Sequence, residues 1–322
     1  MILSAQGAVN KPTLQVSVMT GNTTSSTLPI YSFDTVIWQK GVSFPAQTSR
    51  SVAFSPYLGQ WVALTNSTTV ARSSDGINWA TSTCPNGNTW NNVVWANSIK
   101  LWIGSAVVAT AASNVIMTSP DGITWTNRTG INTNTWRALL WVEELSLALC
   151  SNNNGITGTS LMTSSDGITW TSRTVATNGG MRGMAYAPEL GLICAVFYQK
   201  SVVNTSPDGI TWTQRTGASA AGWTNVAWSP SLGIFCAVAS DGTVGARVQT
   251  SPDGINWTIR STPGGMNLAE VIVWSPRLRL FIVNCANGSA GNGTWTSLDG
   301  INFINASAAT GSATLIGNGI SA

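Results

Sequence analysis

The stretch SPDGITW, residues 119–125, decides the fold because near-copies of it recur along the whole chain. The shared pattern is S-x-D-G-x-x-[WF]. Its six copies are SSDGINW (73–79), SPDGITW (119–125), SSDGITW (164–170), SPDGITW (206–212), SPDGINW (251–257) and SLDGINF (297–303). A degenerate copy, YSFDTVIW, contains Asp34. From Asp34 onward the aspartates of successive copies are 41 to 46 residues apart. A period of roughly 40–50 residues is typical of β-propellers.

A second phrase precedes each copy and indicates how each unit folds. It is an apolar run that ends in an aromatic residue, then a turn, then another apolar run, as in RSVAFSPYLGQWVAL (50–64) and TNVAWSPSLGIFCAV (224–238). Two such runs joined by a short turn predict a hairpin. The D-G turn of the repeated stretch predicts a second hairpin. Each unit is therefore expected to be four short antiparallel strands, the blade of a propeller.

The period and the length of 322 residues predict an all-β, seven-bladed β-propeller of four-stranded antiparallel blades. Six blades is the alternative if the N-terminal copy is an unrelated arm. The ring is expected to be closed by N- and C-terminal strands. The predicted organisation is an N-terminal arm and first closure strand (1–28), the propeller proper (29–305) and a C-terminal closure strand (306–322).

Composition excludes several classes of function. The chain has no histidine, so imidazole-dependent catalysis and the usual zinc motifs are excluded, and neither a metal nor a cofactor is expected. A net charge of +3 with only 8% charged residues argues against nucleic-acid binding. The five cysteines have no C-x-x-C spacing and four lie in apolar runs, which predicts buried thiols made in a reducing compartment. No signal peptide and no membrane insertion are expected.

The repeated stretch resembles the Asp-box, or BNR repeat, of sialidase-type and many other β-propellers. The resemblance covers nearly the whole chain and implies a fold rather than an activity, because this repeat occurs in enzymes and non-enzymes. It implies that the repeat residues are structural, on turns away from the ligand face. The residues concerned are Asp75, Trp79, Asp121, Trp125, Asp166, Trp170, Asp208, Trp212, Asp253, Trp257, Asp299 and Phe303.

The overall composition resembles that of bacteriophage tail and fibre proteins. The chain has few charged residues, is rich in Ser, Thr, Asn, Gly and Trp, and is built of repeats. This resemblance implies a non-enzymatic structural or adhesion module of a virion, made in the host cytoplasm. Its expected partners are other virion proteins and a host-surface glycan, with multiple copies in each particle.

The alternative is a sialidase-like glycoside hydrolase, which needs paired carboxylates or a Tyr nucleophile with a carboxylate and three Arg. Most acidic residues belong to the repeats or to turns at the same end. Only Asp241 and Glu270 are expected to face a substrate, and the sialidase R-I-P motif is absent. The paucity of acids favours a protein that is not an enzyme.

Two sets of residues are candidates for ligand binding. Aligning the first strands places Arg50, Asn91, Arg137, Arg182, Thr224 and Glu270 in one ring at a channel mouth, where Arg can clamp a carboxylate. The alternative is that these polar side chains only bind water or pair with Glu270 and bind no ligand. The variable loops contribute Trp90, Trp136 and Trp223, which suit sugar stacking if exposed and otherwise anchor the core. With Asp241, these residues form the predicted site.

Overall fold

The computed structural model describes residues 17–22, 30–32, 39–40, 49–65, 68–108, 115–132, 135–152, 160–175, 177, 179–264, 266, 268–285, 293–306 and 314–320. Side chains are described from residue 51 to residue 306 within these ranges, except that of Val108. Within these ranges the regular elements are β-strands, apart from one short 3₁₀ helix, η1 (Pro188–Leu190). Asp34 of the degenerate repeat copy lies outside the described residues.

Five sheets have four antiparallel strands each. The first contains β26 (Thr314–Ile320), β1 (Ser17–Asn22), β2 (Ile30–Ser32) and β3 (Gln39–Lys40). The second contains β4 (Ser49–Ser55), β5 (Gln60–Thr65), β6 (Thr69–Ser73) and β7 (Ala80–Thr83). The third contains β8 (Thr89–Ala96), β9 (Leu101–Val108), β10 (Ile116–Ser119) and β11 (Thr126–Arg128). The fourth contains β12 (Trp136–Val142), β13 (Leu147–Asn152), β14 (Leu161–Ser164) and β15 (Thr171–Arg173). The fifth contains β22 (Ala269–Ser275), β23 (Leu280–Cys285), β24 (Thr294–Ser297) and β25 (Ile304–Asn305).

The remaining sheet has six strands in sequence order. They are β16 (Met181–Ala187), β17 (Leu192–Ser206), β18 (Thr213–Ser229), β19 (Ile234–Ala239), β20 (Val248–Ser251) and β21 (Thr258–Arg260). Strands β17 and β18 are 15 and 17 residues long, about twice the length of the longest of the other strands.

The structure is a β-propeller, as predicted, but the predicted number of blades is wrong. Five blades are four-stranded sheets, and one continuous six-stranded sheet occupies the remaining arc of the ring, so seven separate four-stranded blades do not form. Separate blades would require the strands to break near residues 198–201 and 217–222. Both segments lack Pro, Asn and Asp, and they continue as strand, pairing Tyr198 with Gly222 and Lys200 with Ala221.

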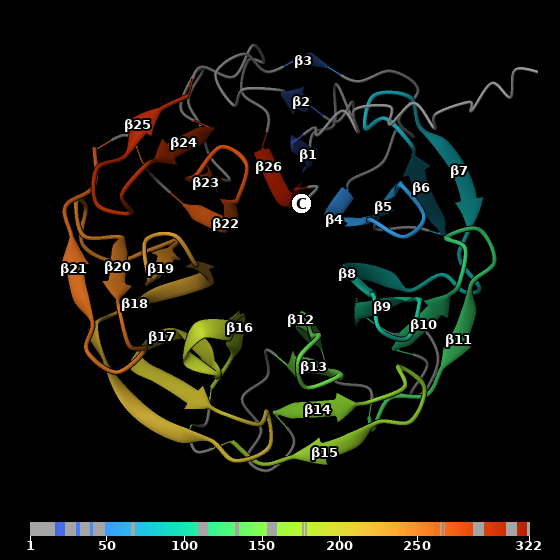
Figure 1. Ribbon diagram of the computed structural model, residues 1–322, viewed down its shortest axis with the longest axis horizontal. Coiled ribbons are helices and arrows are strands. Elements are labelled where there is room, and N and C mark those ends of the chain that lie inside the picture. The colour runs from blue at the N-terminus through green and yellow to red at the C-terminus, as the bar shows by residue number, and fades with distance from the viewer. Residues whose placement is uncertain are drawn as a thin grey trace, which may run out of the picture.

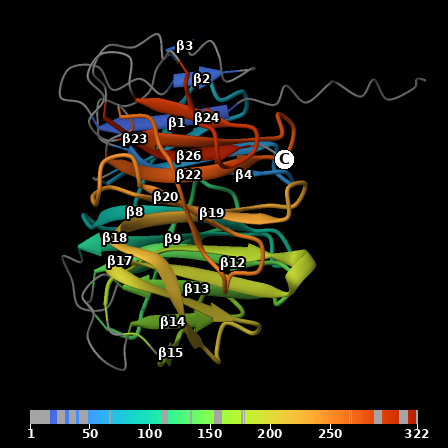
Figure 2. The same ribbon diagram turned by 90° about the vertical axis from the view of Figure 1, so that its left-hand side faces the viewer.

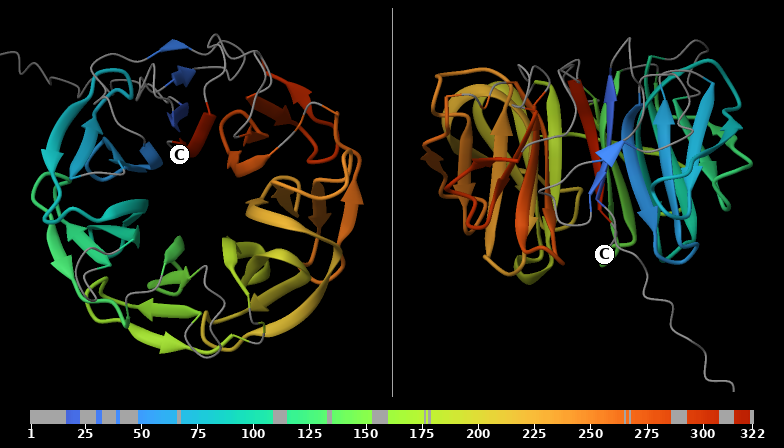
Figure 3. Two further views of the ribbon diagram at one scale, coloured as in Figure 1. Left: turned by 180° about the vertical axis from the view of Figure 1, so that it is seen from behind. Right: turned by 90° about the horizontal axis from the view of Figure 1, so that it is seen from above.

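The sheets stand around a central channel with one strand of each blade innermost (Figure 1). The innermost strands follow one another around the ring as β4, β8, β12, β16, β18, β22 and β26, and the strands run roughly along the ring axis (Figures 1 to 3). Strand β26 pairs with β1, so one sheet contains residues from both ends of the described chain. The boundaries 1–28, 29–305 and 306–322 remain a prediction, and their residues 1–16, 307–313 and 321–322 lie outside the described residues.

The core lies between neighbouring sheets and is built from the inward faces of the first three strands. An aromatic residue at the end of an innermost strand packs on one in the next strand, as Trp95 on Trp102 at 5.0 Å and Trp228 on Phe235 at 4.6 Å between ring centroids. All five cysteines are buried and unpaired, as predicted, and burial raises the pKa of the Cys84 thiol to about 12. These thiols therefore contribute as small apolar groups.

Candidate functional site

The predicted ring residues share one backbone feature. The ladder between the first and second strands shifts register in each of six sheet sectors, and one residue of the first strand is skipped at the shift. The skipped residues are Arg50, Asn91, Arg137, Arg182, Thr224 and Glu270. A β-bulge leaves its extra residue outside the ladder and re-aims the side chain. The bulges thus explain why these six positions are equivalent.

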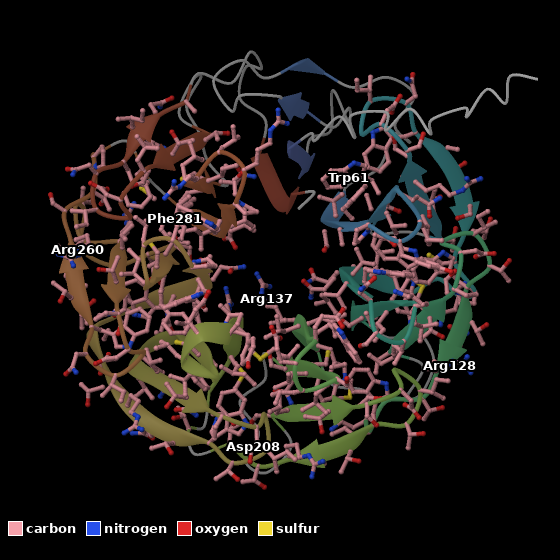
Figure 4. The ribbon with its side chains drawn as sticks, viewed as in Figure 1. Trp61, Arg128, Arg137, Asp208, Arg260 and Phe281 are labelled. Carbon is pink, nitrogen blue, oxygen red and sulfur yellow. The ribbon has the colours of Figure 1, made fainter. Side chains whose placement is uncertain are left out.

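Two ring residues meet across the channel. Arg137 Nη2 lies 3.7 Å from Glu270 Oε2, with the side chains 29% and 22% exposed. Figure 4 shows Arg137 on the inner side of the ring. At this separation and exposure the ion pair is loose and partly hydrated, so a competing carboxylate has access to the guanidinium.

Arg182 lies beside this pair and is held by an aromatic ring. Its guanidinium carbon is 3.8 Å from the ring centroid of Tyr198, a cation–π contact. Burial and the positive charge of Arg137 lower the pKa of Arg182 from its usual value, while Glu270, Tyr198 and Asp241 act in the opposite direction. The arginine stays protonated, and these charges lie close enough to interact.

Asp241 is fixed by the backbone of the long hairpin. The Gly222 N–H donates to Asp241 Oδ1, and a Cβ at Gly222 would lie 2.5 Å from that oxygen and 2.7 Å from Tyr198 Cε2. Only glycine allows the carboxylate and the phenol to approach this segment so closely. We call Arg137, Arg182, Tyr198, Asp241 and Glu270 the channel-mouth cluster. It lies at the end of the channel where the variable loops are.

The other ring residues serve the scaffold or lie outside the described side chains. Asn91 Nδ2 donates to the Arg137 carbonyl at 3.1 Å, and Thr224 Oγ1 donates to the Ala269 carbonyl at 2.7 Å. Both bonds tie an innermost strand to the next one. Arg50 lies in β4, but its side chain is outside the described part of the structure.

The three loop tryptophans are not surface groups. Trp90, Trp136 and Trp223 are each 0% exposed. The Trp223 Nε1–H donates to the Ser219 carbonyl at 3.0 Å. Each precedes a bulge residue by one position, and its own side chain turns into the core. The prediction that they stack on a ligand is therefore wrong, and they anchor the first strands.

The repeated stretches form identical turns at the opposite end of the sheets, which we call the S-x-D-G turns. In one of them Asp208 Oδ1 accepts from the N–H groups of Ile210 and Thr211 at 2.8 and 2.7 Å, and from Ser206 Oγ at 3.0 Å. The Trp212 Nε1–H donates to the Gly209 carbonyl at 3.2 Å. The glycine has φ of +72°, a conformation that other residues avoid.

The same pattern of carboxylate bonds recurs in all six turns. The aspartates concerned are Asp75, Asp121, Asp166, Asp208, Asp253 and Asp299. Partial burial raises the pKa of the Asp166 carboxyl, but the bonds from Thr169, Ile168 and Ser164 outweigh it and bring the pKa to about 2. The companion aromatics, from Trp79 to Phe303, are buried or nearly so. Each turn is thus internally satisfied.

The arginine that follows four of these turns is also structural. Arg128, Arg173, Arg215 and Arg260 each donate Nε–H to a threonine Oγ1 of the neighbouring strand, at 2.7 to 3.2 Å. Figure 4 shows Arg128 and Arg260 on the outer side of the ring, far from Arg137.

Sequence reasoning missed two features. Tyr198 was assigned no role, although its place at the end of the run LICAVFY puts it beside the ring. A cavity of about 580 Å³ within the channel was not predicted either. It is lined by innermost-strand residues such as Val52, Val93, Leu139, Met184 and Ile272, and it extends to the turn prolines Pro188, Pro230 and Pro276.

Among the described residues, no three His, Cys, Asp or Glu side chains are grouped so that they could hold a metal ion. No helix in the described part of the chain is long and apolar enough to cross a membrane.

No family model matches the sequence, and no curated protein matches it. Solved structures do match. A putative 6-phosphogluconolactonase from Bacteroides uniformis is similar with a TM-score of 0.71 at 9% identity, over 95% of this chain and 99% of that chain. A streptogramin B lyase is similar with a TM-score of 0.70 at 9% identity, over 87% and 89%. The GH74 enzyme of Niastella koreensis is similar with a TM-score of 0.58 at 14% identity, over 89% of this chain and 56% of that chain. At these identities the likenesses show the fold alone: the chain is a β-propeller.

Proposed function

We propose that this propeller is a non-enzymatic adhesion module of a bacteriophage virion that binds a carboxylate-bearing glycan of the host surface at the channel-mouth cluster. The observation that carries the proposal is the loose pairing of Arg137 with Glu270 beside the aromatic-backed Arg182. Two guanidiniums at one mouth offer a bidentate site for a ligand carboxylate. The sequences of the variable loops are rich in Asn, Ser and Thr, whose amide and hydroxyl groups suit sugar hydroxyls.

The order of the cluster supports binding by a prearranged site. Bulges fix the directions of Arg137 and Arg182, and the stacking of Arg182 on Tyr198 restricts its guanidinium before any ligand arrives. A group that is already ordered loses less conformational entropy on binding. Because the tryptophans are buried, affinity depends on the arginines rather than on sugar stacking.

The proposed virion role rests on the repeats and the amino-acid composition of the chain. The S-x-D-G turns resemble the Asp-box, and we infer that they are Asp-boxes. The repetitive, charge-poor composition resembles that of phage tail and fibre proteins. On this proposal the protein is made in the host cytoplasm, joins other virion proteins and is present in many copies. A weak single site then gives useful adhesion, because multivalency raises avidity by about 10²–10⁴.

The test of the site is a calorimetric titration with glucuronic acid and N-acetylneuraminic acid, with glucose as the neutral comparison. We expect the acidic sugars to bind and glucose not to, and the double variant Arg137→Ala, Arg182→Ala to lose binding. Glu144→Ala, on an exposed turn at the other end, is the matched control and should bind as the unaltered protein does. Equal binding of glucose, or unchanged binding by the double variant, would refute the proposed ligand.

The virion assignment needs a separate measurement. Antibody-labelled electron micrographs of particles from the producing phage should show the label at a regular position on the virion. Label found only on host-cell material would refute this part of the proposal while leaving the sugar site intact.

A sialidase-like glycoside hydrolase is the second candidate, because the carboxylates of Asp241 and Glu270 lie in the same cluster as the arginines. Turnover of fluorogenic glycosides distinguishes the two. Reproducible turnover abolished by Glu270→Gln or Asp241→Asn favours the hydrolase, and binding without turnover favours the adhesion module.

A further inference from the structure

Exposed apolar side chains gather at one end of the propeller. The turn face is the end formed by the S-x-D-G turns and by the turns between the first and second strands. In the described part of the chain, twelve large hydrophobic residues are exposed, and ten of them lie on this face. These ten are Tyr57, Leu58, Ile123, Ile168, Leu190, Ile210, Leu232, Ile255, Leu298 and Ile301. Val244, 66% exposed, lies in a loop at the other end.

The same face is acidic. Its described turns carry nine carboxylates and three cations, a formal charge of −6 in a chain whose total is +3. The carboxylates are Asp75, Asp121, Glu143, Glu144, Asp166, Glu189, Asp208, Asp253 and Asp299, and the cations are Lys100, Arg277 and Arg279. Hydrogen bonds within the six S-x-D-G turns order their aspartates without neutralising them, since the donors are uncharged N–H and O–H groups.

The channel cavity reaches this face. Its lining ends at Pro188, Pro230 and Pro276, together with the rings of Trp228 and Trp274. Two exposed leucines, Leu190 and Leu232, each lie two residues beyond one of these prolines. At about 580 Å³ the cavity falls within the roughly 300–1,000 Å³ typical of ligand pockets, large enough for apolar side chains.

Two glutamates of this face tie neighbouring turns together. Glu189 Oε2 accepts from Trp228 Nε1–H at 2.7 Å, and Glu143 Oε2 accepts from the Ser98 N–H at 3.0 Å. Glu144 is exposed on the next position of the same turn as Glu143. Glu189 directly follows Pro188 of the cavity lining, so a fixed negative charge lies close to the cavity.

We propose that the turn face docks a basic segment of a partner protein, whose central apolar side chain enters the channel cavity while flanking Lys or Arg side chains meet the carboxylates of the turns. Charge complementarity selects this occupant. A second copy docking by the same face would bring two surfaces of formal charge −6 together, which is repulsive. A partner that is apolar but acidic is rejected for the same reason.

This inference is independent of the sugar site, which lies at the other end of the channel. The probe is a synthetic peptide, acetyl-Lys-Gly-Leu-Trp-Leu-Gly-Lys-amide, titrated by calorimetry. The matched peptides replace both Lys by Glu, or the Leu-Trp-Leu core by three Ser. Leu190→Ser with Leu232→Ser removes exposed apolar groups, Glu144→Lys reverses one charge, and Val244→Ser is the control at the other end. Because all four side chains are surface residues, circular dichroism should show the fold unchanged.

We expect one peptide per protein, with affinity about tenfold or more above that of the Glu and Ser peptides, and weaker binding as salt screens the charges. The Leu190→Ser, Leu232→Ser variant and Glu144→Lys should each weaken binding several-fold, and Val244→Ser should not. Equal binding of the Lys and Glu peptides, no binding of the Lys peptide, or equal loss in Val244→Ser would overturn the proposal. So would sedimentation showing a dimer of the unliganded protein that Leu190→Ser with Leu232→Ser dissociates.

Discussion

Arg137 and Glu270 pair across the central channel although their strands are not neighbours, since β16 and β18 lie between β12 and β22 around the ring (Figure 1). The two side chains therefore span the mouth. A ligand carboxylate that enters the channel-mouth cluster competes with Glu270 for the same guanidinium.

Glu270→Gln should raise the affinity for glucuronic acid, because it frees Arg137 and removes a like charge from the site. The change in the free energy of unfolding should be small, about 1 kcal/mol or less, since the pair is partly exposed. Calorimetric titration and urea denaturation measure the two quantities. A lower affinity would show that Glu270 contacts the sugar instead of competing with it.

Asp208→Ala should destabilise the protein by about 1–3 kcal/mol, because the N–H groups of Ile210 and Thr211 lose their acceptor. Asp208→Asn keeps an acceptor oxygen and should cost less. Urea denaturation of both variants tests this, and sugar binding by the folded protein should be unchanged. A stable Asp208→Ala variant that has lost sugar binding would contradict the structural role of the turn.

Trp212→Ala should cost more than Asp208→Ala, about 3–5 kcal/mol, because it empties a packed aromatic site under the same turn. Thermal unfolding compares the two variants directly. An equal or smaller loss for Trp212→Ala would mean that the turn bonds outweigh the packing.

Acid should destabilise the protein between about pH 4 and pH 2. The pKa of several turn aspartates, Asp75, Asp166, Asp253 and Asp299, is lowered to about 2, against about 3.9 in an unfolded chain. A lowered pKa gives stability that is complete above the unfolded value and is lost as pH falls through the folded value. Urea midpoints measured across this range should fall, and Asp166→Asn should flatten the fall. A constant midpoint would rule out the mechanism.

Gly183→Ala should destabilise by about 1–3 kcal/mol through overpacking of two innermost strands. A Cβ at Gly183 would lie 2.6 Å from the Asn225 Cα on β18 and 3.0 Å from the Val226 nitrogen. Gly87→Ala is the control, because nothing lies within 4 Å of a Cβ there. Thermal unfolding should separate the variants, and equal melting temperatures would refute the close approach of β16 and β18.

The repeat predicted the propeller and its turn geometry because each S-x-D-G stretch contains its own acceptor, its own positive-φ glycine and its own aromatic cover. Such local information suffices for a turn. The number of separate sheets depends on whether residues 198–201 and 217–222 break the strands, and strand continuation there is decided by pairing between segments far apart in the sequence. Local turn signals do not contain that information.

The candidate site also has some features that the sequence predicts and others that it does not. The equivalence of Arg137, Arg182 and Glu270 was visible from alignment of the repeats, because a bulge recurs with the period. The burial of Trp136 and Trp223 could not be predicted from the sequence. An aromatic residue beside a polar loop has the same sequence pattern whether its side chain is buried or exposed. The apolar turn face also escaped notice, because each turn exposes only one or two apolar residues and the face emerges when the ring brings them together.

The recurring bulge also makes this ring a scaffold whose central chemistry can be rewritten. Each bulge residue stands outside the strand ladder, and Asn, Arg, Thr and Glu occupy equivalent positions beside a buried residue that is Trp, Met or Ala. Backbone bonds hold Asn91 and Thr224 in place, whereas the side chains of Arg137 and Glu270 stay partly exposed at the channel mouth. A protein engineer can exchange the charges at Arg137, Arg182 and Glu270 in combination and obtain a library of channel mouths, from cationic to anionic, on one unchanged frame.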